Sequence, residues 1–234
     1  MTFDLERARR TTPARLGVGR AGVRPPTAAW LAFLADHAAA RDAVWSEWSV
    51  AFLDRLRALG FLLVASAAPD RIDYVREPPL GRRLAAGELE RIRDASRHEV
   101  AIQIVVSDGL SASAAEAHLE RLWPALCERL APLGPFSTPV AVRNGRVAVA
   151  DVIASAAGAC LAVHLIGERP GLASPDSLGC YVTLHPGPQS TDADRKCISN
   201  IRPAGLDPAE AGATIAGLCR RIMDHGSSGT DLVL

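Results

Sequence analysis

Hydrophobic residues recur at helical spacing through the first 97 residues. Spacing of three and four residues places each series of large side chains on one helical face. The two series are Trp30, Phe33, Leu34 and His37, and Trp45, Trp48, Phe52, Leu56 and Leu59. The second series stops at Gly60, which is typical of a helix end. The pattern predicts a mainly helical N-terminal part whose aromatic stripes pack into a core.

After residue 97 the pattern changes to short apolar runs, which are typical of buried strands. Strands are expected at residues 100–106, 136–142, 159–166 and 178–185. A parallel sheet places the carboxyl ends of its strands at one edge, where ligands bind in α/β proteins. If the first and third of these strands are parallel, residues 107–109 and 167–169 lie at that edge.

Helix signals separate these runs. Ser113 and Glu116 have the spacing of a capping box, and Pro124 is expected to bend or restart the helix that follows them. A short helix is expected over residues 151–158. The last helix is expected to start at Asp207, with Pro208 in its first position and Glu210 completing a capping box, and to end at His225-Gly226.

Alternating strands and helices predict an α/β fold with a layered domain and a mainly parallel sheet. We place this domain at residues 98–234 and the smaller, mostly helical part at residues 1–97. Long polar loops on such a scaffold commonly carry function. Two segments stand out for their turn residues, 167–179 and 191–203. From residues alone, the ligand of this loop-built site stays open.

Composition narrows the class of protein. The 26 basic and 26 acidic side chains balance, whereas a general nucleic-acid binder needs excess positive charge. Mean hydropathy is +0.11, no apolar run approaches the roughly 20 residues that span a bilayer, and no apolar signal-peptide core begins the chain. Five cysteines without a CxxC motif indicate reduced thiols. A cytoplasmic protein is expected.

Familiar catalytic motifs are weak. Residues 17–22 fit a GxGxxG pattern, but the preceding strand is weak and Pro25-Pro26 interrupts the helix that should follow. The six histidines form no i,i+4 pair, and no GxSxG sequence occurs. His164, within an apolar run, is expected to be a hydrogen-bonded core residue. Asp192 and Asp194 are expected in a solvated turn, because two carboxylates without a third ligand make a poor cation site.

A family resemblance lies in these same segments. Ser107-Asp108-Gly109-Leu110-Ser111, Gly167-Glu168-Arg169-Pro170-Gly171-Leu172 and Cys197-Ile198-Ser199-Asn200-Ile201 resemble signatures of the ethanolamine ammonia-lyase small subunit. Shorter matches also occur, and together the segments appear in the family's order across nearly the whole chain. The shorter matches are Gly19-Arg20-Ala21-Gly22 with Arg24-Pro25, Phe33-Leu34-Ala35-Asp36-His37, Gly81-Arg82-Arg83-Leu84 and Gly145-Arg146-Val147.

The resemblance implies a Rossmann-like α/β domain and a role in converting ethanolamine to acetaldehyde and ammonia by radical chemistry. It implies that adenosylcobalamin is covered at the interface with a barrel-shaped large subunit, in a hetero-oligomer with several copies of each. No catalytic residue is implied here. Coenzyme contacts are implied at Val147, Glu168 and Cys197, with Arg146 a lower-ranked candidate for the coenzyme's phosphate. The coenzyme keeps its own base as the lower cobalt ligand, so this chain supplies none.

Two departures and two alternatives remain. Some relatives have a long N-terminal extension that aids packaging into a bacterial microcompartment, whereas this chain begins close to the shared core, which makes encapsulation doubtful. The loop Pro186-Gly187-Pro188 also differs. The first alternative is a stand-alone nucleotide-binding α/β enzyme, which would turn over without a partner. The second is an assembly subunit that has lost coenzyme contact.

Overall fold

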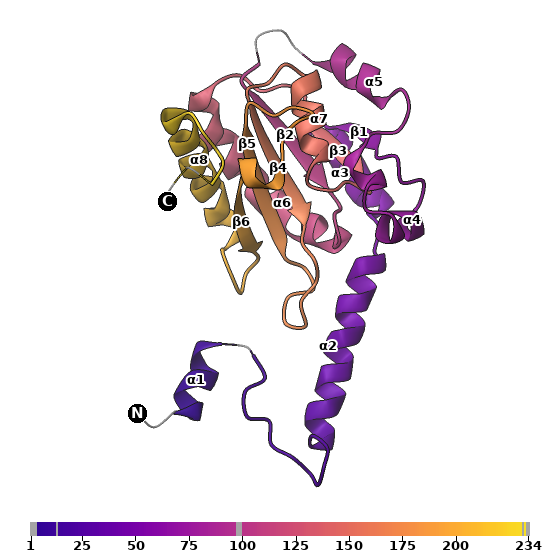
Figure 1. Cartoon of the computed structure of the whole chain (residues 1–234), viewed down its shortest axis with the longest axis vertical. Coiled ribbons are helices and arrows are strands. Elements are labelled where there is room, and N and C mark those ends of the chain that lie inside the picture. The colour runs from indigo at the N-terminus through magenta and orange to yellow at the C-terminus, as the bar shows by residue number, and fades with distance from the viewer. Residues whose placement is uncertain (1–3, 13, 97–99, 231, 233–234) are drawn as a thin grey trace.

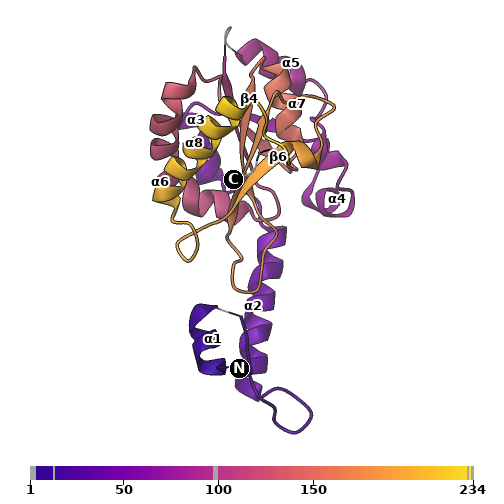
Figure 2. The ribbon, with the colours of Figure 1, turned by 60° about the vertical axis from the view of Figure 1, so that its left-hand side comes forward.

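A six-stranded sheet forms the centre of the protein, with helices on both of its faces (Figures 1 and 2). The structure is a computed structural model and describes residues 4–12, 14–96, 100–230 and 232. The strands are β1 (Leu62–Ala65), β2 (Ile102–Ser107), β3 (Val140–Arg143), β4 (Leu161–Gly167), β5 (Leu178–Leu184) and β6 (Arg195–Ile201). The helices are α1 (Leu5–Thr11), α2 (Thr27–Trp45), α3 (Val50–Ala58), α4 (Arg71–Arg76), α5 (Glu88–Ala95), α6 (Ala112–Leu130), α7 (Val149–Ala156) and α8 (Pro208–His225), with short 3-10 turns η1 (Leu80–Arg82), η2 (Ala131–Leu133) and η3 (Asp192–Asp194).

The sheet has the order β1-β3-β2-β4-β5-β6 and is mostly parallel. Strands β1, β3, β2 and β4 run in one direction, while β5 is antiparallel to β4 and β6 is antiparallel to β5. A parallel pair needs a long crossover, usually an α-helix, and no α-helix lies between β4 and β5 or between β5 and β6. The short connections therefore impose antiparallel pairing at this side. The expected α/β fold with a mainly parallel sheet is confirmed.

Two hydrophobic layers enclose the sheet. On one face α3, α6 and α8 pack against the strands, and Figure 2 shows these helices together on one side. On the other face α5 and α7 cover the parallel strands, with Ile92 and Ile153 fully buried between helix and sheet. Both faces of β2 and β4 are thus covered, which explains why these strands read as continuous apolar runs.

Helix α6 differs from its expected form. It runs through Pro124 as one element, because its buried leucines on either side keep packing against the sheet. The capping box of Ser113 and Glu116 is not formed: the Glu116 carboxylate accepts a hydrogen bond from the backbone N–H of Ser49 instead. At α8 the Asp207 carboxylate does accept from a backbone N–H of the first turn, that of Ala209, at 2.8 Å, although no capping box with Glu210 is formed.

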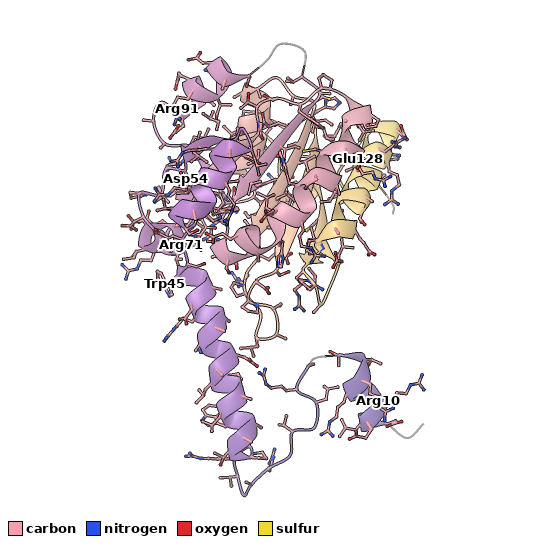
Figure 3. All side chains as sticks on the ribbon, turned by 180° about the vertical axis from the view of Figure 1, so that it is seen from behind. Arg10, Trp45, Asp54, Arg71, Arg91 and Glu128 are labelled. Carbon is pink, nitrogen blue, oxygen red and sulfur yellow. The ribbon has the colours of Figure 1, made fainter. Side chains whose placement is uncertain are left out.

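The N-terminal segment forms an arm that extends away from the sheet (Figures 1 and 3). Its helix α2 buries only Ala43, and Trp30, expected in the core, is 48% exposed. The expected second stripe is divided, because α2 ends at Trp45 and α3 begins at Val50. The arm meets the body beside Trp45, where Arg71 donates a hydrogen bond to a backbone carbonyl of the helix. The prediction of core packing for the first stripe is therefore wrong.

Strand β1 lies in the part of the chain that was expected to be mainly helical, and it joins the same sheet as the later strands. The expected domain boundary at residues 97 and 98 falls outside the described residues, so the division there stays a prediction. Within the described residues, no helix is both long and apolar enough to cross a membrane.

Candidate functional site

A cavity of about 420 Å³ opens at the carboxyl ends of β2 and β4. This is the edge at which the sequence placed a ligand site. Three of the four expected site residues, Arg146, Val147 and Glu168, line the cavity together. The fourth, Cys197, lies outside the lining on β6, paired in register with Tyr181, which does line it.

Two glycines let the loop after β2 cross the end of β4. Gly109 adopts a φ of +56°, and a Cβ atom there would collide with the carbonyl oxygen of Gly167. A Cβ atom on Gly167 would collide with the carbonyl oxygens of Ser111 and Asp108. The Leu110 N–H donates to the Gly167 carbonyl at 2.9 Å. These contacts form the floor of the cavity.

The β3–α7 loop, residues 144–148, forms one wall and is fixed by hydrogen bonds from neighbouring elements. The buried Asp108 carboxylate accepts from the N–H groups of Asn144 at 2.9 Å and Gly145 at 3.3 Å. The Tyr74 hydroxyl donates to the Gly145 carbonyl at 3.2 Å. The Arg146 N–H donates to the Gly81 carbonyl at 2.7 Å. Because its backbone is held at several points, this loop presents its side chains in a defined position.

Arg146 gives this wall its charge. Its guanidinium lies over the Tyr74 ring, with the central carbon 4.1 Å from the ring centroid, and its Nε atom is buried without a hydrogen-bond partner. Burial lowers the pKa of Arg146, and the positive charges of Arg71, Arg169 and Arg82 act in the same direction. An anionic group in the cavity would relieve this repulsion.

Glu168 lines the same cavity, and its carboxylate is already engaged in hydrogen bonds. Its carboxylate accepts hydrogen bonds from the hydroxyls of Ser177 and Ser199 and from the N–H of Asn200. It therefore ties the β4–β5 loop to strand β6, a role that its position in a loop does not reveal. A carboxylate accepts about four hydrogen bonds, so about one position remains for a ligand.

Cys197 lies on the exposed face of β6, next to the cavity rim. Surrounding protein atoms partly desolvate its thiol and raise its pKa. The side chain is therefore a neutral thiol at physiological pH rather than a thiolate nucleophile.

A model of the family described as "Ethanolamine ammonia-lyase light chain (EutC)" matches residues 4–233. This chain belongs to that family. Curated relatives named ethanolamine ammonia-lyase small subunit agree: the Azotobacter vinelandii protein is 47% identical, covering 97% of this chain and 87% of its own. The Bradyrhizobium diazoefficiens protein is 45% identical, and the match covers 99% of this chain and 89% of the relative. The Ralstonia nicotianae protein is 47% identical, and the match covers 94% of this chain and 84% of the relative. The expected family is confirmed.

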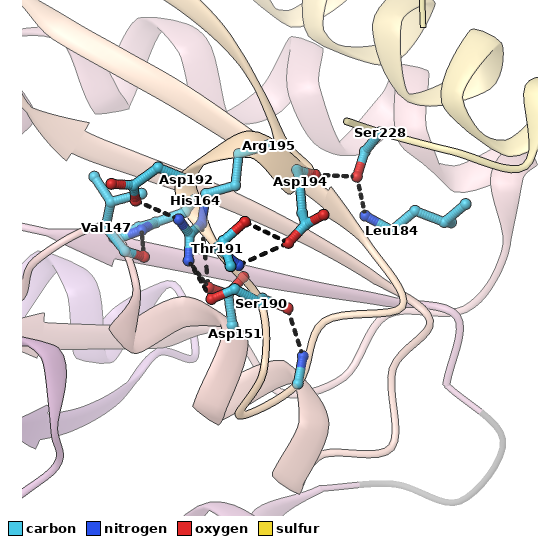
Figure 4. Close-up of polar contacts among 11 residues, drawn as sticks. Val147, Asp151, His164, Leu184, Ser190, Thr191, Asp192, Asp194, Arg195 and Ser228 are labelled. Carbon is cyan, nitrogen blue, oxygen red and sulfur yellow. Dashed lines mark hydrogen bonds and ion pairs between the residues drawn. The ribbon is translucent and has the colours of Figure 1, made fainter. Parts of the chain in front are cut away.

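In this light chain His164 is buried, as expected for a core residue, but its partners were not foreseen. One ring nitrogen, Nε2, lies 2.7 Å from the Ser107 hydroxyl, and the other, Nδ1, lies 3.2 Å from the Val147 carbonyl oxygen (Figure 4 shows the contact with Val147). Burial lowers the pKa of His164 to about 3. The ring is therefore neutral across the physiological range.

The region around Asp192 contains a buried ion pair rather than a cation site. Arg195 on β6 bonds to the buried Asp151 carboxylate of α7 and, at 2.6 Å, to Asp192 (Figure 4). Asp194 accepts from the N–H and hydroxyl of Thr191. No group of three or more His, Cys, Asp or Glu residues suited to a metal ion occurs among the described residues.

The light chain's GxGxxG segment, residues 17–22, lies in the N-terminal arm. No strand precedes it within the described residues, and α2 begins only after Pro26. The strand–turn–helix context of a dinucleotide site is therefore missing, as expected.

We expect His164→Asn to change how stability depends on pH. The folded state holds His164 neutral, with a pKa of about 3, whereas the unfolded chain binds a proton near pH 6.5. The contribution that neutral His164 makes to the free energy of unfolding is therefore fully present above about pH 6.5. It is lost as pH falls below that value, by about 1.4 kcal/mol per pH unit. Between pH 7.5 and 5, the wild type should lose about 2 kcal/mol relative to His164→Asn. Urea unfolding of both chains at several pH values measures this difference, and parallel curves would contradict it.

Proposed function

We propose that this chain, as the small subunit of ethanolamine ammonia-lyase, binds one side of adenosylcobalamin in the cavity at the carboxyl ends of β2 and β4. The observation that supports this proposal most is the convergence of Arg146, Val147 and Glu168 on one cavity from two separate loops. Adenosylcobalamin, when bound, supplies radical chemistry through homolysis of its cobalt–carbon bond. This chain contributes binding, orientation and exclusion of water.

The chemistry of the cavity suits this coenzyme. A corrin ring has a broad apolar rim with neutral amide arms, and the coenzyme carries a phosphate. Val147, Leu110 and Ile166 offer apolar surface in the cavity, and Glu168 retains about one acceptor position for an amide N–H. The positive charge of Arg146 and of the neighbouring Arg169 and Arg82 suits a phosphate oxygen.

The size of the cavity indicates shared binding. Cavities of roughly 300–1,000 Å³ enclose most of a drug-sized ligand, and this one has about 420 Å³. Adenosylcobalamin is far larger, so this chain holds only part of it, and a large subunit completes the site. Both ring nitrogens of His164 have partners within the protein. No histidine is among the described residues that line the cavity, so the proposal assigns no cobalt ligand to this chain.

The proposal places Cys197 at the rim of this site. It pairs with Tyr181, which lines the cavity, and it lies two residues before Ser199, another lining residue, on the same face of β6. A small neutral thiol there permits close approach of the coenzyme's edge when the large subunit closes over it.

We expect Glu168→Ala to weaken cobalamin binding by the two-subunit enzyme about 10–100-fold, because a charge-assisted hydrogen bond in a partly dry site contributes roughly 1.5–3 kcal/mol. The same change should also lower the melting temperature, since Ser177, Ser199 and Asn200 lose their common acceptor. Turnover at saturating coenzyme should change less. Titration of cobalamin, followed by visible absorption, measures the affinity.

Ser177→Ala is the matched control for this variant. It removes one bond to the Glu168 carboxylate but leaves the carboxylate in place. Its stability should fall while its cobalamin affinity stays within about threefold of the wild type. Equal affinities for Glu168→Ala and the wild type would show that Glu168 only ties the loop to β6, and would overturn its place in the proposed site.

A further inference from the structure

His164 and Ser107 make a hydrogen-bonded chain that ends at the backbone of a cavity residue. The two side chains come from the adjacent parallel strands β4 and β2. The Val147 carbonyl oxygen can only accept, so the proton of the neutral ring must reside on Nδ1, 3.2 Å away. The bare Nε2 then accepts from the Ser107 hydroxyl at 2.7 Å. The geometry thus fixes both the tautomer and the direction of each bond.

The surroundings keep this histidine from titrating or binding a ligand itself. His164 is 1% exposed, Tyr181 lies opposite it on β5, and Arg195 on β6 adds positive charge nearby. Both ring nitrogens have partners inside the protein. Any effect on a ligand must therefore pass through the residue that His164 holds.

That residue lies at the end of the wall loop, 144–148. Asp108 holds the start of this loop through two N–H groups, and His164 holds the carbonyl at its far end. Gly145 lies between them, and a Cβ atom there would collide with the Ser107 hydroxyl. The loop can approach β2 this closely only because residue 145 is glycine. The sequences Ser107-Asp108 and Gly145-Arg146-Val147 therefore fit together through contacts that neither motif shows alone.

We propose that Ser107 and His164 form a positioning pair that fixes Val147, and with it Arg146, for contact with the coenzyme before the coenzyme binds. This inference rests on the proposed function. Preorganisation of this kind strengthens binding because the ligand does not have to order the loop. The pair acts on affinity and leaves the chemical step to other groups.

The test compares cobalamin affinity across variants of the two-subunit enzyme, measured by equilibrium dialysis with cyanocobalamin. His164→Leu removes both bonds and should weaken binding about tenfold. His164→Asn should stay within about threefold of the wild type, because its amide N–H takes the place of Nδ1–H. Rescue by asparagine is not expected of a residue that merely fills the core. Equal losses in the leucine and asparagine variants would overturn the proposal.

Gln103→Leu is the matched control for a buried polar residue. Gln103 is fully buried at the start of β2, where its amide donates to the carbonyls of Ile104 and Thr138, far along the strand from the cavity. This variant should lose stability but keep its cobalamin affinity. If it weakens binding as much as His164→Leu does, the effect of His164 is general loss of structure, and the proposal fails.

A double-mutant cycle with Val147→Ala separates this proposal from the proposed function. If His164 acts through Val147, its loss should weaken binding less in the Val147→Ala background than in the wild type. If the two substitutions instead weaken binding by independent factors, the proposed positioning role of His164 is wrong, while the proposed coenzyme site stands. An unchanged affinity in Val147→Ala alone would instead count against the proposed coenzyme site.

Discussion

Purified alone, this chain is expected to release no ammonia from ethanolamine, while the two-subunit enzyme should exceed it by at least about a thousand-fold, since enzymes accelerate reactions 10⁶-fold or more. The physical reason lies in the cavity. Both nitrogens of His164 are engaged within the protein, and the thiol of Cys197 is held neutral by its raised pKa. Neither of these two side chains therefore supplies an activated nucleophile or a free base for catalysis.

Co-expression with the large subunit tests this expectation. The two chains should co-elute in gel filtration, and ammonia release should follow the shared peak when adenosylcobalamin is present. Robust release by the rigorously pure small subunit would contradict the account. Turnover without a partner is what a stand-alone nucleotide-binding enzyme would show, so the same experiment separates the two functions.

Gly167→Ala is expected to destabilise the chain by about 3–5 kcal/mol, near the upper end for a single substitution. The added methyl group would collide with the backbone carbonyls of Ser111 and Asp108, which cannot swing away as a flexible side chain would. The loop after β2 would have to move away from the end of β4, and this movement would disrupt the floor of the cavity. Cobalamin binding by any folded fraction should therefore also weaken.

Gly187→Ala is the control for this change. Gly187 lies in the loop between β5 and β6, and an added Cβ atom would meet nothing within 4 Å. Its cost should stay within about 0.5 kcal/mol. Urea unfolding of the three chains measures the difference. Equal stability of Gly167→Ala and the wild type would show that the close approach of the two segments is not required.

The buried strands could be predicted because burial on both faces leaves a continuous apolar run. The strand expected at residues 159–166 begins two residues before β4, Leu161–Gly167, and ends one residue before it. Strand β6 could not be found in this way. It is an edge strand whose middle residues are largely exposed, so its sequence reads as a polar loop. Strand β5, by contrast, is mostly buried and matches the strand expected at residues 178–185.

The aromatic stripe of α2 shows a different limit of pattern reasoning. Helical spacing tells which side chains share a face, but not whether the chain itself covers that face. Leu31 and Leu34 are 59% and 42% exposed, although their spacing is that of a core helix. Packing partners are a property of the fold, and they do not appear in a single helical pattern.

At the site, strand ends could be predicted but contacts between strands could not. Glu168 follows a buried strand, and the rule for parallel sheets placed it at the ligand edge. Its three partners come from segments that only the antiparallel register of β5 and β6 brings together. Ser107 and His164 meet because β2 and β4 pair with Val105 opposite His164, a register that no local pattern specifies.

The most direct test of the central claim is a titration of adenosylcobalamin into the small subunit, the large subunit and their complex, followed by visible absorption in the dark. The account predicts tight, saturable binding only by the complex, and binding weakened about 10–100-fold when the complex carries Glu168→Ala. Equally tight binding by the large subunit alone would contradict the claim that this chain supplies part of the coenzyme site.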